Sequence, residues 1–193
     1  MKTTLALAVA LLVSAGTAHA QTSFGVKAGL NLANLSIDEA DDTFEPENRT
    51  GFVAGVFVTV RGGGIFAFQP EVLISSQGAK FSDAVNSGTA KIDYLQVPLL
   101  ARLGPSNVAL VVGPSIGFRI NAKLSGDGIT VDNEDFSDQI ERMDVGLVAG
   151  VTGDIGRLVL DGRYTWGLTN IEKEETAAST KNRVISLTVG LRF

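Results

Sequence analysis

Eight charged side chains lie inside apolar stretches of this sequence, and they are its best candidates for chemistry in a confined space. Five are basic and three are acidic: Lys27, Glu71, Arg102, Arg119, Asp144, Asp161, Arg163 and Arg192. An unpaired charge in a narrow protein interior costs several kcal/mol, so these groups must pair or stay hydrated. Pairing would give a plug of salt bridges, whereas hydrated charges would line a gate or a narrow charge-selective pore.

One short motif resembles a catalytic site. Residues 113–117, Gly-Pro-Ser-Ile-Gly, match the G-x-S-x-G pattern around the nucleophile of many hydrolases. That pattern needs a strand-to-helix turn and a histidine that accepts the serine proton. The sequence has no cysteine, and its one histidine, His19, lies in a segment expected to be removed. We therefore expect no catalytic residue, and an enzyme is the weakest of the functional hypotheses.

Acidic residues gather between the apolar stretches. Sixteen of the 21 Asp and Glu residues lie there, with six in 33–49 and six in 122–142. Clustered carboxylates can bind calcium, but segment 127–138 lacks the spacing and the glycine of an EF-hand loop. A solvated surface is therefore expected rather than a metal or cofactor site. The net charge of −5 argues against nucleic acid as a partner.

The first twenty residues have the layout of a secretory signal peptide. Lys2 gives a positive start, residues 5–13 are an unbroken apolar run, and Ala18-His19-Ala20 forms a cleavage site. A membrane-spanning helix needs about 20 apolar residues, so this run is too short for an anchor. We predict a signal peptide over 1–20 and a single β-barrel domain over 21–193.

The rest of the chain alternates between apolar and small or polar residues with a period of two. Strict alternation places the two sets on opposite faces of a β-strand. It recurs in eight segments: 24–32, 52–60, 66–75, 95–103, 108–120, 143–151, 158–168 and 185–193. The connections after the second, fourth and sixth segments are short, whereas the others run to roughly ten to twenty residues. This pattern predicts an all-β fold, an eight-stranded antiparallel up-and-down transmembrane barrel.

The composition of the two faces indicates which one is dry. One face carries many of the chain's 22 glycines, which fit a narrow interior but cannot coat a soluble surface. The other is bulky and apolar on every strand, as lipid requires. Aromatic residues fall near strand ends, as a membrane girdle requires: Phe24, Phe66, Phe68 and Phe193 at one rim, Phe52, Phe118 and Trp166 at the other. The alternative is a soluble, lipocalin-like binding barrel in the periplasm.

Several strings point to a family. The segments 69–73 (QPEVL), 94–100 (YLQVPLL), 160–164 (LDGRY), 167–171 (GLTNI), 182–184 (NRV) and 191–193 (LRF) resemble the PorT-like outer-membrane β-barrel family. The resemblance implies an eight-stranded barrel in the bacterial outer membrane and no defined activity. Phe193 also resembles the C-terminal signal by which the barrel-assembly machinery recognises such proteins for insertion.

These features predict a non-enzymatic barrel with a structural or surface-interaction role. Its partners would be outer-membrane lipid, the barrel-assembly machinery during insertion and an extracellular or periplasmic protein. Counting positions along neighbouring strands places the lumenal charges in three groups: Arg119 with Asp144 near the outer rim, Asp161 with Arg192 lower down, and Glu71 midway within reach of Arg163 and Arg102. A plug of salt bridges is favoured, because eight strands enclose a space that side chains just fill. A small passive channel gated by these charges is the alternative.

Overall fold

The computed structural model describes residues 21–38, 47–62, 64–82, 87–126, 129–131, 143–169 and 179–193. Its strands are β1 (Gln21–Asp38), β2 (Glu47–Arg61), β3 (Phe66–Ser82), β4 (Ser87–Leu103), β5 (Val108–Gly126), β6 (Ile129–Val131), β7 (Met143–Ile155), β8 (Leu158–Gly167) and β9 (Ser179–Arg192). No helix within these ranges is long and apolar enough to cross a bilayer.

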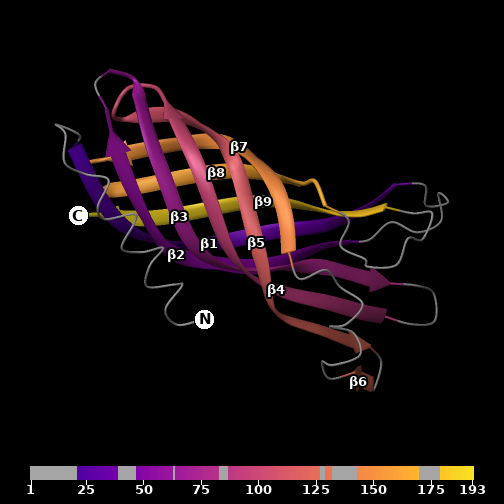
Figure 1. Cartoon of the computed structure of the whole chain (residues 1–193). Coiled ribbons are helices and arrows are strands. Elements are labelled where there is room, and N and C mark those ends of the chain that lie inside the picture. Colours follow the sequence, from indigo (N-terminus) through magenta and orange to yellow (C-terminus); the bar gives the residue numbers. More distant parts are fainter. Residues whose placement is uncertain are drawn as a thin grey trace, which may run out of the picture.

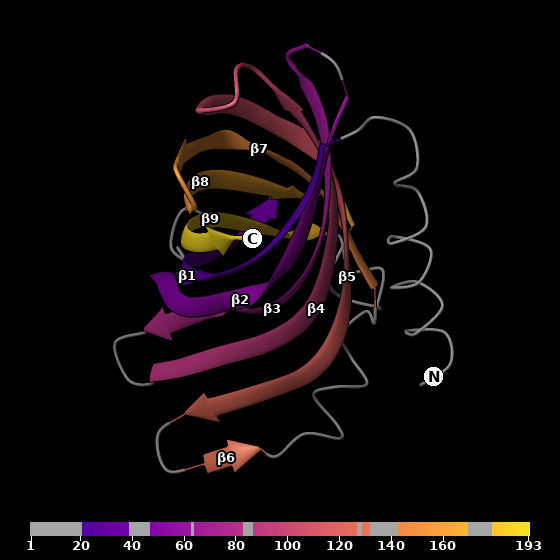
Figure 2. The ribbon, with the colours of Figure 1, turned by 90° about the vertical axis from the view of Figure 1, so that its left-hand side faces the viewer.

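Eight of these strands close into an antiparallel barrel. The ring runs β4-β3-β2-β1-β9-β8-β7-β5, and pairing between β4 and β5 completes it (Figures 1 and 2). The three-residue β6 pairs only with the end of β5, outside the ring. The predicted eight-stranded up-and-down barrel is confirmed, and β6 is a small addition that the alternation did not indicate.

Short turns and long connections lie at opposite ends of the barrel. The turns β2–β3, β4–β5 and β7–β8 share one end with the start of β1 and the end of β9 (Figure 1). Gly64 and Gly156 adopt positive φ angles of 83° and 62° in two of these turns, a conformation that favours glycine. In outer-membrane barrels the short-turn end faces the periplasm, and we name the two ends periplasmic and outer on that basis.

Several strands are longer than a membrane requires. A transmembrane strand needs about 9–11 residues, whereas β1 has 18 and β5 has 19. The surplus lies at the outer end, because the turns at the other end are tight. The expected long connection after the third apolar segment is wrong, since only residues 83–86 separate β3 from β4. Their hairpin continues as paired sheet beyond the alternating region.

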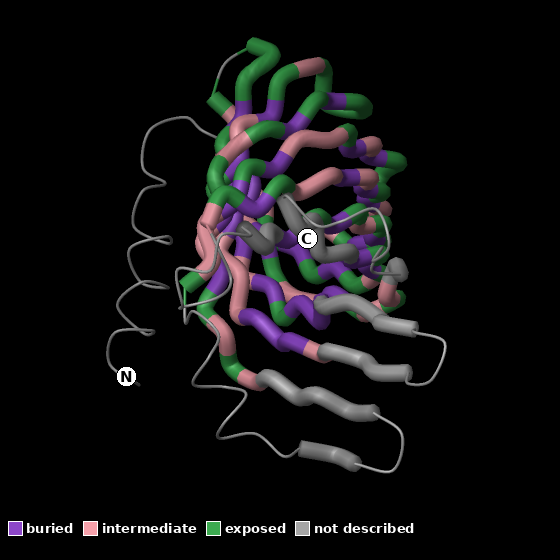
Figure 3. Tube along the Cα trace, turned by 90° about the vertical axis from the view of Figure 1, so that its right-hand side faces the viewer, coloured by how far each residue is buried: buried purple, intermediate pink, exposed green. Residues whose placement is uncertain are grey.

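The barrel is apolar outside and polar inside. Among the described residues, 17 polar or charged residues are buried against 13 hydrophobic ones, the reverse of a soluble core. Figure 3 shows buried and exposed positions alternating along the strands. All seven aromatic residues expected at the two rims are exposed: Phe24, Phe52, Phe66, Phe68, Phe118, Trp166 and Phe193. The apolar face is therefore the lipid face, and a soluble binding barrel is ruled out.

Candidate functional site

Four charged side chains form a layer across the middle of the lumen. Lys27 projects from β1, Glu71 from β3, and Asp161 and Arg163 from β8. Lys27 Nζ lies 2.8 Å from Glu71 Oε1 and 3.1 Å from Asp161 Oδ2. Arg163 Nη2 lies 3.1 Å from the same Asp161 oxygen. Two cations thus face two anions, and the layer is electrically neutral.

Glu71 is the centre of this layer. Arg163 binds it in a bidentate manner, with Nη1 donating to Oε2 at 2.8 Å and Nη2 donating to Oε1 at 2.9 Å. Gln69 Nε2 also donates to Oε1, at 2.7 Å. The Glu71 side chain has no exposed area, and that of Arg163 is 6% exposed. A buried carboxylate with this many charge-assisted donors has its desolvation offset by good geometry.

The layer spans the full width of the barrel. In the ring, β3 and β8 are separated by β2, β1 and β9 on one side and by β4, β5 and β7 on the other. They are therefore opposite walls, and the bond between Arg163 and Glu71 crosses the lumen along a diameter. Side chains meeting at that position fill the central section of an eight-stranded barrel, as its narrow interior permits.

A second group of ion pairs lies on the periplasmic side of this layer. Asp154 Oδ2 accepts from Arg102 Nη2 at 3.0 Å and from Arg192 Nη1 at 2.6 Å. Gln69 connects the two groups, because its Oε1 accepts from Arg102 Nη1 at 2.9 Å while its amide nitrogen binds Glu71. The described polar network is therefore continuous from the middle of the barrel to its periplasmic end.

Inward glycines make the room that this network needs. A Cβ on Gly25 would overlap the Phe57 ring, and one on Gly190 would lie 3.4 Å from it. Phe57 turns inward from β2 and lies beneath the ammonium of Lys27, which is 5.5 Å from the ring centroid. The aromatic face and the two carboxylates together hold the buried cation. The inward glycines predicted from the sequence therefore leave room in the lumen, and larger side chains from neighbouring strands fill it.

The outer half of the lumen is joined largely by amides and hydroxyls. Asn31 donates to Ser75 Oγ at 2.8 Å and accepts from Ser186 Oγ at 2.7 Å. Nearer the outer rim, Asp144 accepts from Thr169 Oγ1 at 2.8 Å and from Asn182 Nδ2 at 3.0 Å. The ion pair described towards this end, Lys91 with Asp93 at 3.2 Å, is part-exposed, unlike the pairs deeper in the barrel.

Five of the eight predicted charges are buried, namely Lys27, Glu71, Arg102, Asp161 and Arg163, and Asp144 and Arg192 bind buried side chains. Arg119 is half-buried on β5. The pairs differ from the expectation. Arg192 does not meet Asp161; it binds Asp154, because strand stagger sets Asp161 opposite Thr188. Arg119 and Asp144 form no ion pair in the described structure. Gly117, two residues before Arg119, is the residue opposite Asp144. Arg163 does bind Glu71, whereas Arg102 reaches it only through Gln69.

Asp154 is the functional residue that the sequence reasoning missed. The alternation predicts the end of this strand at residue 151, yet β7 continues through Ile155 and carries Asp154 into the lumen. It stands ten residues after Asp144, so continuing the same alternation would have found it. Gln69 lies two residues before Glu71, so the alternation predicts the same face for both, but Gln69 carries no charge and is not among the eight predicted residues.

The described residues offer no arrangement for catalysis by the serine motif. Residues 113–117 lie inside β5, not at a strand-to-helix turn. Ser115 is buried in the lumen and its strand neighbours are Pro98 and Gly146. No group of three or more potential metal ligands occurs within the described parts of the chain.

A closed antiparallel barrel with an apolar exterior, aromatic rims and a charged interior defines an outer-membrane β-barrel protein. Residues 19–173 match the family described as outer membrane protein beta-barrel domain. The chain belongs to that family, and its location is the bacterial outer membrane.

Two solved structures are similar in fold. Ail, the attachment invasion locus protein of Yersinia pestis, is 17% identical with a TM-score of 0.51, and the match covers 90% of this chain and 99% of Ail. Neisserial surface protein A is 13% identical with a TM-score of 0.53, and the match covers 90% of this chain and 99% of that protein. Comparison with curated proteins gives no significant match.

Proposed function

We propose that this protein is a sealed, non-enzymatic barrel that acts at the cell surface through its acidic outer connections. The single observation that carries the sealed lumen is the neutral layer of Lys27, Glu71, Asp161 and Arg163, which joins opposite walls. A neutral, dry layer presents a crossing ion with a high desolvation cost. The barrel would then be a scaffold that presents its outer connections.

The charge of those connections favours a cationic partner. The acids in 33–49 and 122–142 lie outside the described side chains. We take these segments to lie at the outer end, because the tight turns of the barrel lie at the other end. Segment 33–49 has six acids and one basic residue, Arg49. Ail has been crystallised with the heparin analogue sucrose octasulfate. This chain's outer connections carry charge of the sign that repels such a polyanion, so we infer a basic protein surface as the partner.

Binding of poly-L-lysine to the protein in zwitterionic vesicles tests the surface role. A variant with Asp38, Glu39, Asp41, Asp42, Glu45 and Glu47 changed to their amides should fold normally and bind the polycation at least tenfold more weakly. Binding by the original protein should also weaken as salt is added. Equal affinity for both proteins would contradict the proposal.

A narrow channel is the second candidate, and the observation that favours it is a cavity at the periplasmic end. This cavity of about 510 Å³ brings solvent close to the charged layers. Planar-bilayer recording separates the two functions. If the barrel is sealed, we expect no current steps from the inserted protein. Steps whose size changes in the Glu71→Gln variant would instead support the channel.

Within the family, the strings quoted above favour the PorT-like branch. We propose that placement without any role in protein secretion. The signal peptide over 1–20, insertion by the barrel-assembly machinery and the absence of a cofactor belong to the same proposal. Mass spectrometry of the protein isolated from outer membranes would test the first of these, with Gln21 expected as the first residue.

A further inference from the structure

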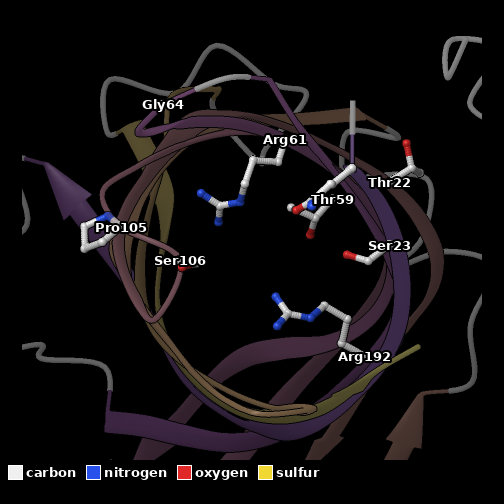
Figure 4. A pocket seen from close by; sticks show the side chains of 9 residues that line it. Thr22, Ser23, Thr59, Arg61, Gly64, Pro105, Ser106 and Arg192 are labelled. Atoms are coloured by element: carbon white, nitrogen blue, oxygen red, sulfur yellow. The ribbon is translucent and has the colours of Figure 1, made fainter. Parts of the chain in front are cut away.

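The periplasmic mouth of the barrel contains a vestibule into which several polar side chains project. Its volume is about 510 Å³, and its walls are the start of β1, the end of β2, Arg192 of β9 and two of the short turns. Figure 4 shows Arg61 and Arg192 reaching into it from β2 and β9, the strands on either side of β1. The side chains of Ser23 and Ser106 lie on the same walls. A cavity of this size is large enough for a small molecule.

The two arginines of the vestibule differ in how many of their hydrogen-bond donors are used within the protein. Arg192 uses both terminal nitrogens within the protein, donating to Asp154 Oδ2 at 2.6 Å and to the Gly156 carbonyl at 3.1 Å. Arg61 has a buried Nη2 without a hydrogen-bond partner in the described structure. A buried donor of this kind keeps a hydrogen bond that a water or an anion can accept. Arg61 is therefore the group that can bind a ligand.

The charges around the vestibule are mostly positive. Arg61, Arg102 and Arg192 supply three guanidinium groups at this end of the lumen, and Asp154 is the one carboxylate described among them. The neutral central layer adds nothing to offset them. Low-dielectric walls concentrate the field of such a group and attract anions.

The vestibule is also preformed. Gly104 N donates to the Ile65 carbonyl at 2.9 Å, which ties two of the turns together. Asp154 N donates to the Asn107 carbonyl at 2.8 Å, and Arg192 N donates to the Arg157 carbonyl at 2.8 Å. A ligand would therefore lose little binding energy to ordering this rim.

We propose that the vestibule is a binding site for a small oxyanion, a phosphate or carboxylate group carried by a periplasmic molecule. The Arg61 guanidinium would bind two of its oxygens, a geometry that suits both groups. The hydroxyls of Ser23 and Ser106 would donate to the others. This inference is independent of the surface role, because the site lies at the opposite end of the barrel.

The test is titration of the refolded full-length barrel in zwitterionic micelles, once with inorganic phosphate and once with acetate, followed by amide NMR. Saturable shifts should be confined to the vestibule, and the anion that binds more tightly identifies the ligand group. Arg61→Gln should weaken binding at least tenfold. Arg157→Gln removes the same charge from an exposed turn at the same end, outside the vestibule, and should change affinity less than twofold.

A second variant guards against misreading a folding defect as lost binding. Asp154→Asn removes the carboxylate that competes for Arg192 and Arg102, so it should tighten anion binding at least twofold, which partial misfolding would not do. Equal losses in Arg61→Gln and Arg157→Gln would show a general attraction to a basic rim and overturn the proposal. So would the absence of saturable shifts with both anions.

Discussion

Arg163 of β8 and Glu71 of β3 bind each other across the diameter of the barrel, with both terminal nitrogens of the arginine donating to the two carboxylate oxygens. The two residues stand on walls that share no backbone hydrogen bond. Their contact is therefore a tertiary interaction that braces the cylinder from within. In a barrel whose exterior is solvated by lipid, such cross-lumen contacts take the place of a hydrophobic core.

The first prediction concerns removal of the Glu71 charge. Glu71→Gln leaves Lys27 and Arg163 with a single carboxylate between them, that of Asp161. Breaking a buried pair in this way costs about 3–5 kcal/mol, so the urea midpoint in detergent micelles should fall sharply. The control is Lys91→Gln, because Lys91 is 37% exposed in its 3.2 Å pair with Asp93. That change should cost less than about 1 kcal/mol, and equal losses would refute the bracing role.

The second prediction concerns the packing of β1 against β9. A Cβ on Gly29 would overlap the carbonyl oxygen of Leu187, which is backbone and cannot move aside easily. Gly29→Ala should therefore destabilise the barrel by about 1–3 kcal/mol or more. Gly162→Ala is the matched control, because its Cβ would meet nothing closer than Leu187 Cδ2 at 3.6 Å. If the two variants unfold at the same urea concentration, the inferred close contact between β1 and β9 at Gly29 is wrong.

The third prediction uses the single tryptophan as a reporter of the lipid face. Trp166 is 41% exposed on the outside of β8. Its fluorescence should be quenched strongly by lipids brominated on their acyl chains and weakly by aqueous acrylamide. The control moves the reporter into the lumen, in a Trp166→Phe, Tyr94→Trp variant, since Tyr94 is only 1% exposed. Lipid quenching of that variant equal to the original would contradict the assignment of the two faces.

The fourth prediction separates recognition from stability at Phe193. Its ring is 58% exposed to lipid and stacks on Phe24 with centroids 5.5 Å apart. Losing one aromatic pair costs about 0.5–1.5 kcal/mol, so Phe193→Ala should refold in micelles nearly as well as the original. If Phe193 is an insertion signal, its amount in outer membranes of cells should drop several-fold. Phe24→Ala removes the same pair and should insert normally; a similar drop in both variants would mean that only the pair matters.

The sequence predicted the fold well because lipid imposes a simple rule. Alternation over residues 24–32 placed Phe24 and Leu30 outside and Lys27 inside, and each is found there. The alternation no longer predicts the strands where they extend beyond the membrane. The segment joining β3 to β4 was expected to be a long connection, but it continues as sheet, since strands above the membrane need no apolar face.

The partners inside the lumen were harder to predict. Alternation gives the face of a side chain but not its height, which depends on the stagger between strands. Asp161 and Arg192 were expected to meet, yet the stagger of β8 and β9 sets Asp161 opposite Thr188. The true partner of Arg192 is Asp154. The alternation predicts the end of that strand at residue 151, whereas β7 continues four residues further, to Ile155.

The seam between β1 and β9 has a consequence for the time course of assembly. It joins residues near the two ends of the barrel domain, with Gly25 opposite Arg192. Until that seam forms, both edge strands present unpaired N–H and C=O groups to hydrocarbon. Contacts between such distant parts of a chain form slowly. A substitution that weakens the seam should therefore slow insertion of the barrel, even where the folded variant is nearly as stable as the original protein.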